Sequence, residues 1–238
     1  MNNPTENEID DLFDRYQKGQ YDDAEKLAKS IIQKYPNHAF SWKVLGAVYK
    51  NTGKLQDSLV ANRKAVELVP TDAAAHNNLG ITLQELLMLD EAEKCYRRAI
   101  DLSPEFSEAH NNLGVTLQER GNLADAEQSY KNTISINADF IQAHYNLGIT
   151  LQELGRFEEA KESYKNAIAI NPNHADAHYN LGNTYKEFNR LEEAESSYRK
   201  ALELNPNFAN AFNNLGIVLQ EFGKLEESEA CYRQAISM

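Results

Sequence analysis

A 34-residue period constrains the fold of this chain more tightly than any other feature of its sequence. Five of the six prolines lie on one strict grid, and alanine fills the single vacant grid position. The grid consists of Pro36, Pro70, Pro104, Ala138, Pro172 and Pro206. Self-similarity at a fixed period of this length is the signature of a repeat architecture, in which each unit buries its apolar face only against its neighbours. The sequence therefore predicts one solenoid domain.

The register set by this grid divides the chain into a tail, residues 1–4, and seven units, of which the last is incomplete. The units are 5–38, 39–72, 73–106, 107–140, 141–174, 175–208 and 209–238. Leucine and glycine recur at positions 7 and 8, as in Leu79-Gly80, and a small residue and a tyrosine recur at positions 20 and 24, as in Ala92 and Tyr96. This spacing contains the helical period twice per unit. It predicts two antiparallel helices, joined by a turn that glycine or asparagine permits at position 15.

The second unit carries the fullest set of marker residues, which are Trp42, Leu45-Gly46, Tyr49, Gly53, Ala65 and Pro70. This pattern resembles the tetratricopeptide repeat family, strongly over residues 39–238. The first unit has Asp11-Leu12 in place of Leu-Gly and keeps only the second half of the pattern, as a capping unit would. The resemblance implies an all-α, right-handed superhelical solenoid of about seven units and fourteen helices, in which the first helix of each pair lines the concave side.

On that concave side the resemblance places positions 2, 5, 6, 9, 12 and 13 of each first helix, and helical spacing also puts these positions on one face. Position 6 is asparagine in five consecutive units: Asn78, Asn112, Asn146, Asn180 and Asn214. Glutamine extends the series at position 12, as Gln84, Gln118, Gln152 and Gln220, and an acidic rim of glutamates follows at position 13. Because an amide both donates and accepts hydrogen bonds, such a ladder predicts binding of extended peptide backbone with little regard to its sequence.

A ladder of this kind is similar to the superhelix of the O-linked N-acetylglucosamine transferase family, where it holds the backbone of protein substrates. The resemblance implies the same role for the five asparagines. The alternative is that they hydrogen-bond between adjacent units and hold the superhelical pitch. Tyr145, Tyr179 and Asn183 distinguish the fifth and sixth units from their neighbours, and we expect them to add side-chain specificity.

Four histidines that stand one unit apart suggest a metal array at first sight; they are His76, His110, His144 and His178. Equivalent residues of adjacent units lie about 8–10 Å apart, whereas two nitrogens on one zinc ion each lie about 2.0–2.1 Å from it. We therefore assign these histidines to helix packing and predict no metal site. The repeat accounts for every glycine, and no catalytic triad or phosphate loop has support. The sequence predicts no cofactor and no enzyme activity.

The balance of charge bears on the partner. A formal net charge of −12, with scattered lysines and arginines, disfavours nucleic acid and anionic membranes. No apolar run approaches the roughly 18 residues that span a bilayer, and no leader follows Met1. Cys95 and Cys231 occupy equivalent positions four units apart and are too distant to pair. We expect a cytoplasmic chain whose partner is a protein or peptide segment, extended and basic.

Two irregularities concern self-association. Leu87 takes the turn position of the third unit where glycine is expected, so the turn either exposes apolar surface or is repacked locally. The chain stops at Met238, before the next grid position and without the polar capping helix that solenoid ends need. We expect either a longer parent chain or end-to-end packing with another copy.

The leading hypothesis is a protein-interaction scaffold that binds an extended peptide segment in its concave groove. One alternative is the substrate-recognition arm of a larger glycosyltransferase-like or other modifying enzyme. Another is a self-assembling homo-oligomeric scaffold. The length of the native reading frame would separate the first alternative from an adaptor, and a concentration-dependent mass would identify the second.

Overall fold

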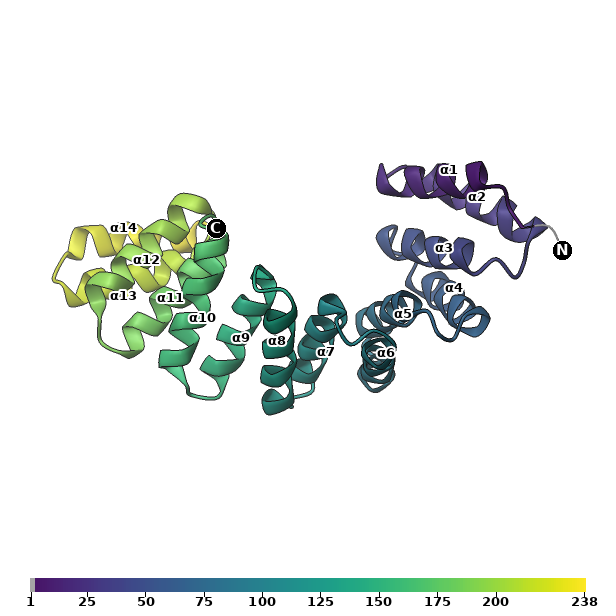
Figure 1. Cartoon of the computed structure of the whole chain (residues 1–238). Helices are drawn as coiled ribbons and strands as arrows, with labels where there is room; N and C mark the ends of the chain where they lie inside the picture. Colours follow the sequence, from purple (N-terminus) through teal and green to yellow (C-terminus); the bar gives the residue numbers. More distant parts are fainter. Residues whose placement is uncertain (1–2) are drawn as a thin grey trace. The chain divides into compact units, whose positions relative to one another are not determined.

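The computed structural model describes residues 3–238, which form fourteen α-helices and no strand (Figure 1). Residues 1–2 of the expected tail lie outside the described residues. The chain divides into two compact units, Met1–Arg120 and Gly121–Met238, and the boundary lies in the turn after the seventh helix. Every helix of residues 3–238 is too short or too polar to span a bilayer. The prediction of an all-α chain with two helices per 34 residues is confirmed.

The first unit contains seven helices, each packed against the next one along the chain. The helices are α1 (Glu6–Gln17), α2 (Tyr21–Lys34), α3 (Ala39–Asn51), α4 (Leu55–Leu68), α5 (Ala73–Glu85), α6 (Leu89–Leu102) and α7 (Ser107–Glu119). The odd-numbered helices also contact one another, so that α3 touches both α1 and α5, and α5 touches α7. One face of this unit is therefore built from first helices alone.

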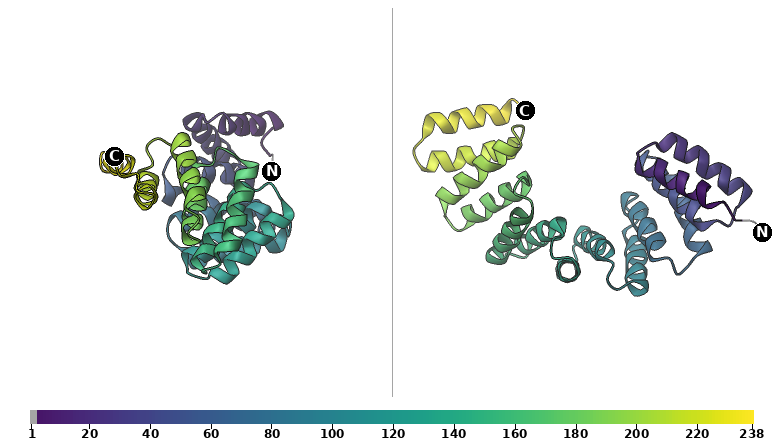
Figure 2. Two further views of the ribbon diagram at one scale, coloured as in Figure 1. Left: turned by 90° about the vertical axis from the view of Figure 1, so that its left-hand side faces the viewer. Right: turned by 45° about the horizontal axis from the view of Figure 1, so that its top comes forward.

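The second unit repeats this arrangement with α8 (Leu123–Ile136), α9 (Ile141–Glu153), α10 (Phe157–Ile170), α11 (Ala175–Glu187), α12 (Leu191–Leu204), α13 (Ala209–Glu221) and α14 (Leu225–Ile236). Each helix again packs against its successor, and α9 contacts α11. The helices α11 to α14, green to yellow in Figure 2, lie side by side and alternate in direction.

Contact between glycine and tyrosine explains why the repeat needs both. Tyr96 is fully buried, and a Cβ atom added to Gly80 would lie only 2.6 Å from Cε1 of its ring. The same approach occurs between Gly148 and Tyr164, where the distance is 2.5 Å. Because no side chain fits at position 8, the two helices of a pair approach closely and the tyrosine fills the space beside them.

Helix ends follow the turn chemistry of the sequence. Position 15 has positive φ in every described turn between first and second helices, including Leu87 (φ 59°) and Asn189 (φ 55°). The helix α8 ends at Ile136 although Ala138 replaces the grid proline, and Oδ1 of Asn137 accepts a hydrogen bond from the backbone of Asp139 (3.1 Å). An asparagine turn thus ends this helix without proline.

Partly buried carboxylates link consecutive second helices. Glu25 lies between two lysines. Its Oε1 is 2.6 Å from Nζ of Lys29 on the same helix, and its Oε2 is 2.8 Å from Nζ of Lys54, which precedes α4. Glu127 holds Lys131 and Arg156 in the same way, both at 2.6 Å. Hydrogen bonds from Lys29 and Lys54 lower the pKa of Glu25 below its ordinary value. Each such carboxylate joins one repeat to the next.

Candidate functional site

The five asparagines predicted to form a ladder all lie on first helices, one each on α5, α7, α9, α11 and α13. In the first unit, Nδ2 of Asn112 donates to Oδ1 of Asn77, which lies on α5, at 3.1 Å. Asn78, next to Asn77, is half-buried on the same helix. The side chain at position 6 therefore reaches the residue at position 5 of the preceding repeat.

The second unit uses tyrosine as the partner at position 5. Nδ2 of Asn180 donates to the hydroxyl of Tyr145 at 3.2 Å, and Nδ2 of Asn214 donates to the hydroxyl of Tyr179 at the same distance. Asn214 also donates to Oδ1 of Asn183 at 2.8 Å. All of these residues, Asn183 included, were singled out as separate features of the sequence, and the structure joins them by hydrogen bonds. Asn146 on α9 is buried and accepts from Gln142 at 2.8 Å.

Aromatic neighbours fix both tyrosines. The ring of Tyr145 lies 4.7 Å from that of His174, and the ring of Tyr179 lies 4.7 Å from that of Phe208, measured between centroids. Burial raises the pKa of Tyr145 above its ordinary value, with a further contribution from Asp176. The Tyr145 hydroxyl consequently stays protonated at neutral pH and can donate as well as accept.

These contacts belong to the alternative that the sequence left open, in which the asparagines bond between adjacent repeats. They occupy only part of each amide, because an asparagine offers two N–H donors and two acceptor positions. Asn180 donates one N–H to Tyr145. Asn214 donates to both Tyr179 and Asn183 and keeps acceptor capacity at its Oδ1. Asn180 and Asn214 are half-buried and so remain partly open to solvent. The inter-repeat bond and the binding of a ligand are compatible at one side chain.

The glutamines at position 12 have a partner that the sequence pattern did not predict. The tyrosine at position 24 of the same repeat donates its hydroxyl to the glutamine Oε1. This bond joins the buried Tyr96 to Gln84 (3.0 Å) and the buried Tyr164 to Gln152 (3.1 Å), and it joins the half-buried Tyr232 to Gln220 (3.2 Å). Gln118 occupies the same position on α7. A constant spacing of twelve residues between glutamine and tyrosine was the available signal.

In the sixth repeat the tyrosine hydroxyl keeps a hydrogen bond, but to a different acceptor. Lys186 replaces the glutamine there, and the hydroxyl of Tyr198 donates instead to Oδ1 of Asn183 at 2.8 Å. Asn183 therefore compensates for a lost acceptor in its own repeat, in addition to contacting Asn214. Its exceptional identity has a structural reason that the sequence alone did not reveal.

A hollow of about 420 Å³ opens on the first-helix face of the first unit, between α5 and α7. It is lined by Ile81, Gln84, Glu85, Leu87, Asn112 and Glu119. Nε2 of Gln84 donates to both carboxylate oxygens of Glu119 at 3.3 Å, which bridges the two helices. One ladder asparagine and two glutamates of the acidic rim thus share a wall with two apolar side chains.

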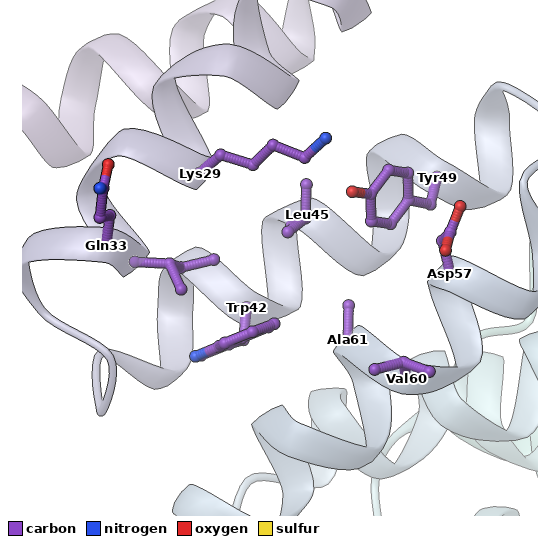
Figure 3. Close-up of a pocket in the computed structure, with 9 residues that line it drawn as sticks. Lys29, Gln33, Trp42, Leu45, Tyr49, Asp57, Val60 and Ala61 are labelled. Carbon is purple, nitrogen blue, oxygen red and sulfur yellow. The ribbon is translucent and has the colours of Figure 1, made fainter.

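A second hollow of about 320 Å³ lies over α3, flanked by α2 and α4 (Figure 3). Trp42, Leu45, Tyr49 and Val60 give it a mainly apolar lining, and Lys29 extends across it toward Tyr49. Trp42 is anchored by the bond from its Nε1 to the carbonyl of Pro36 (2.8 Å). The repeat pattern did not predict this hollow, although tryptophan at position 4 occurs only in this repeat.

The periodic histidines have the packing role that their spacing predicts. Each ring Nε2 bonds a backbone oxygen six residues earlier at 2.9–3.0 Å, in the place where Trp42 bonds Pro36; the pairs are His76–Pro70, His110–Pro104, His144–Ala138 and His178–Pro172. Within residues 3–238 no group of three or more histidine, cysteine or acidic side chains is arranged to hold a metal ion.

Comparison with known proteins decides the family. Models described as tetratricopeptide repeat match residues 14–73, 73–106, 95–128, 139–207 and 197–230. The chain belongs to the tetratricopeptide repeat family. No curated protein sequence matches it.

Solved structures agree with this assignment. A tetratricopeptide repeat protein from Parabacteroides merdae is 21% identical, with a TM-score of 0.71 over 98% of this chain and 92% of that one. MamA is 25% identical, with a TM-score of 0.64 over 67% of this chain and 93% of that one. YrrB, described as a tetratricopeptide repeat protein with an unusual peptide-binding site, is 23% identical, with a TM-score of 0.64 over 77% and 95%. As a member of this family, the chain is a protein-interaction scaffold.

Proposed function

We propose that the first-helix face binds an extended segment of another protein, and that the ladder asparagines hydrogen-bond its backbone. The observation that carries the proposal is the geometry of Asn180 and Asn214. Each is held in place by a tyrosine of the preceding repeat, at 3.2 Å, while the rest of its amide remains on a half-exposed face. A side chain fixed by a neighbour loses less entropy when a ligand binds than a mobile one does.

The spacing of the repeats fits an extended ligand. Adjacent packed helices lie about 8–10 Å apart, and an extended chain advances about 3.3 Å per residue. One rung of the ladder therefore meets about every third residue of the ligand. The first-helix face of the second unit carries the half-exposed Asn180 and Asn214, and the buried Asn146 lies one repeat before them. A segment of about nine residues would pass all three positions.

Charge favours a basic segment, as the sequence analysis expects. The net charge is −12, and glutamate occupies position 13 beside the ladder in five consecutive repeats. The peptide-binding site named for YrrB supports the proposal by analogy of fold alone. The proposal gives the chain a binding role and assigns it no catalytic step.

The test separates ligand binding from the structural role of the same amide. Random peptides about 12 residues long would be screened against the wild-type chain, a length that covers three rungs. Binders would then be titrated against Asn180→Ala and Tyr145→Phe. Both variants lose the bond between Asn180 and Tyr145, but only the first loses the amide, and phenylalanine keeps the ring.

We expect Asn180→Ala to weaken binding about fivefold, the equivalent of one hydrogen bond of about 1 kcal/mol, and Tyr145→Phe to weaken it less. Thermal unfolding followed by circular dichroism would record the loss of stability in both. Equal weakening of binding by the two variants would refute the proposal, because the amide would then act only through the inter-repeat bond.

A further inference from the structure

Leu87 combines two unfavourable properties in one residue. It lies in the left-handed region at φ 59°, where five equivalent turn positions have glycine, and its side chain is 80% exposed. The other exception, Asn189, belongs to a residue type that tolerates this conformation. A leucine here has neither the backbone freedom of glycine nor the burial that stabilises an apolar side chain, and strain of this kind concentrates at functional sites.

The side chain of Leu87 lines the hollow between α5 and α7 that is described above. Ile81 provides a second apolar surface in the same hollow, one turn and a half earlier on α5. Asn112, a ladder residue, forms part of the opposite wall. A segment that follows the ladder would therefore pass directly over Leu87.

The remaining wall of the hollow is acidic. Oε1 of Glu85 lies 3.9 Å from Nζ of Lys50. The carboxylate of Glu119 accepts a hydrogen bond from the neutral amide of Gln84 at 3.3 Å. One lysine thus faces two carboxylates, and the wall keeps a net negative charge. A basic side chain placed beside Glu119 would meet a carboxylate that no cation neutralises within the described contacts.

We propose that this hollow selects, within the bound segment, an apolar side chain next to a lysine or arginine. The apolar side chain packs against Leu87 and Ile81, and the cation pairs with Glu119. This inference rests on the proposed function, because it requires a segment that lies along the ladder. Charge complementarity identifies the occupant as a basic segment of another protein.

The experiment uses those binders selected from random peptides that Asn112→Ala weakens, since Asn112 is the ladder residue of this hollow, and compares three variants of the full chain. Leu87→Asn removes the apolar contact and introduces the residue that already occupies this conformation at Asn189. Leu225→Asn is the matched control, since it removes a leucine that is 65% exposed at the start of α14. Glu119→Gln removes the charge and keeps the shape of the side chain.

We expect the binders to be enriched in an apolar residue beside a basic one. Leu87→Asn should weaken them about tenfold, and the loss should disappear when the apolar residue of the peptide is replaced by serine. Glu119→Gln should weaken only the peptides that carry the basic residue, and Leu225→Asn should leave every affinity unchanged. Because Leu87→Asn relieves strain, its unfolding midpoint should not fall, so that misfolding does not explain a loss of binding.

Equal affinities for Leu87→Asn, Leu225→Asn and the wild type would overturn the inference. Because the peptides compared depend on Asn112, the proposed function would then stand without the inference. If neither Asn112→Ala nor Asn180→Ala weakened any selected binder, both would fail. A wild-type chain that sediments as an oligomer, and that Leu87→Asn converts to a monomer, would identify a second copy as the occupant and would also overturn the inference.

Discussion

Substitution of Leu87 by glycine should stabilise the protein, although it removes a large apolar side chain. Leucine is 80% exposed at this position, so its removal sacrifices little burial. The backbone stands at φ 59°, and glycine holds the equivalent turn position in five other repeats. Stability should therefore rise because backbone strain disappears.

The magnitude follows from two opposing terms. A residue with a Cβ in the left-handed region costs about 1–2 kcal/mol, whereas glycine gives up about 0.5–1 kcal/mol through its greater freedom in the unfolded chain. The net gain for Leu87→Gly is then about 0–1.5 kcal/mol, with a central value of about 0.75 kcal/mol. For a chain of this size each kcal/mol moves the midpoint of thermal unfolding by about 2–4 °C.

Thermal and urea unfolding, followed by circular dichroism, would measure this gain. Leu87→Ala is the matched control, because alanine removes most of the side chain but keeps the Cβ and the strain. Asn189→Gly is the second control and should change stability little, since asparagine already tolerates its φ of 55°. The reasoning fails if Leu87→Ala stabilises as much as Leu87→Gly, or if Leu87→Gly lowers the midpoint.

Three further predictions concern packing and pH. Gly80→Ala should lower the melting midpoint, because the new Cβ would lie 2.6 Å from Cε1 of Tyr96. This overpacking costs about 1–3 kcal/mol and outweighs a gain in helix propensity of about 1 kcal/mol. Adding Tyr96→Leu should restore part of the loss. Burial raises the pKa of Tyr96, so above about pH 10 the unfolded chain loses the phenolic proton that the folded chain keeps. The free energy of unfolding, measured by urea titration, should therefore fall above about pH 10. It should fall less in Tyr96→Phe. Hydrogen bonds from Lys29 and Lys54 lower the pKa of Glu25, so Glu25→Gln should destabilise at neutral pH, and its difference from wild type should vanish as the pH falls below about 4.

Periodicity predicted the fold because it reports which residues are equivalent. The glycine and the tyrosine at positions 8 and 24 recur together, and the structure brings Gly80 and Tyr96 into contact as the packing argument requires. The same logic placed the periodic histidines in helix packing. The grid proline is not required to end a second helix, since Asn137 ends α8 in a repeat that lacks one.

The 34-residue period does not show which side chain of a neighbouring helix a given side chain contacts. Asn180 bonds the hydroxyl of Tyr145, and Gln84 accepts from Tyr96; both contacts depend on side-chain directions between helices and not on spacing within one helix. The hollow at Leu87 was equally hidden. The sequence identified an unusual residue in the turn, but only the structure shows that its side chain stays exposed beside Ile81 and Glu119.

The central claim is that ladder asparagines bond the backbone of a ligand, and chemical editing of that backbone tests it most directly. A selected peptide would be synthesised as a series in which one amide nitrogen at a time is methylated, which removes one donor and keeps the side chain. Each member would be titrated by fluorescence anisotropy against the wild type and against Asn180→Ala. The account predicts one position at which methylation weakens the wild type about fivefold and leaves the affinity of Asn180→Ala unchanged, since the bond is already missing there. If every methylated peptide loses the same factor against both proteins, Asn180 does not bond the ligand backbone and the account is contradicted.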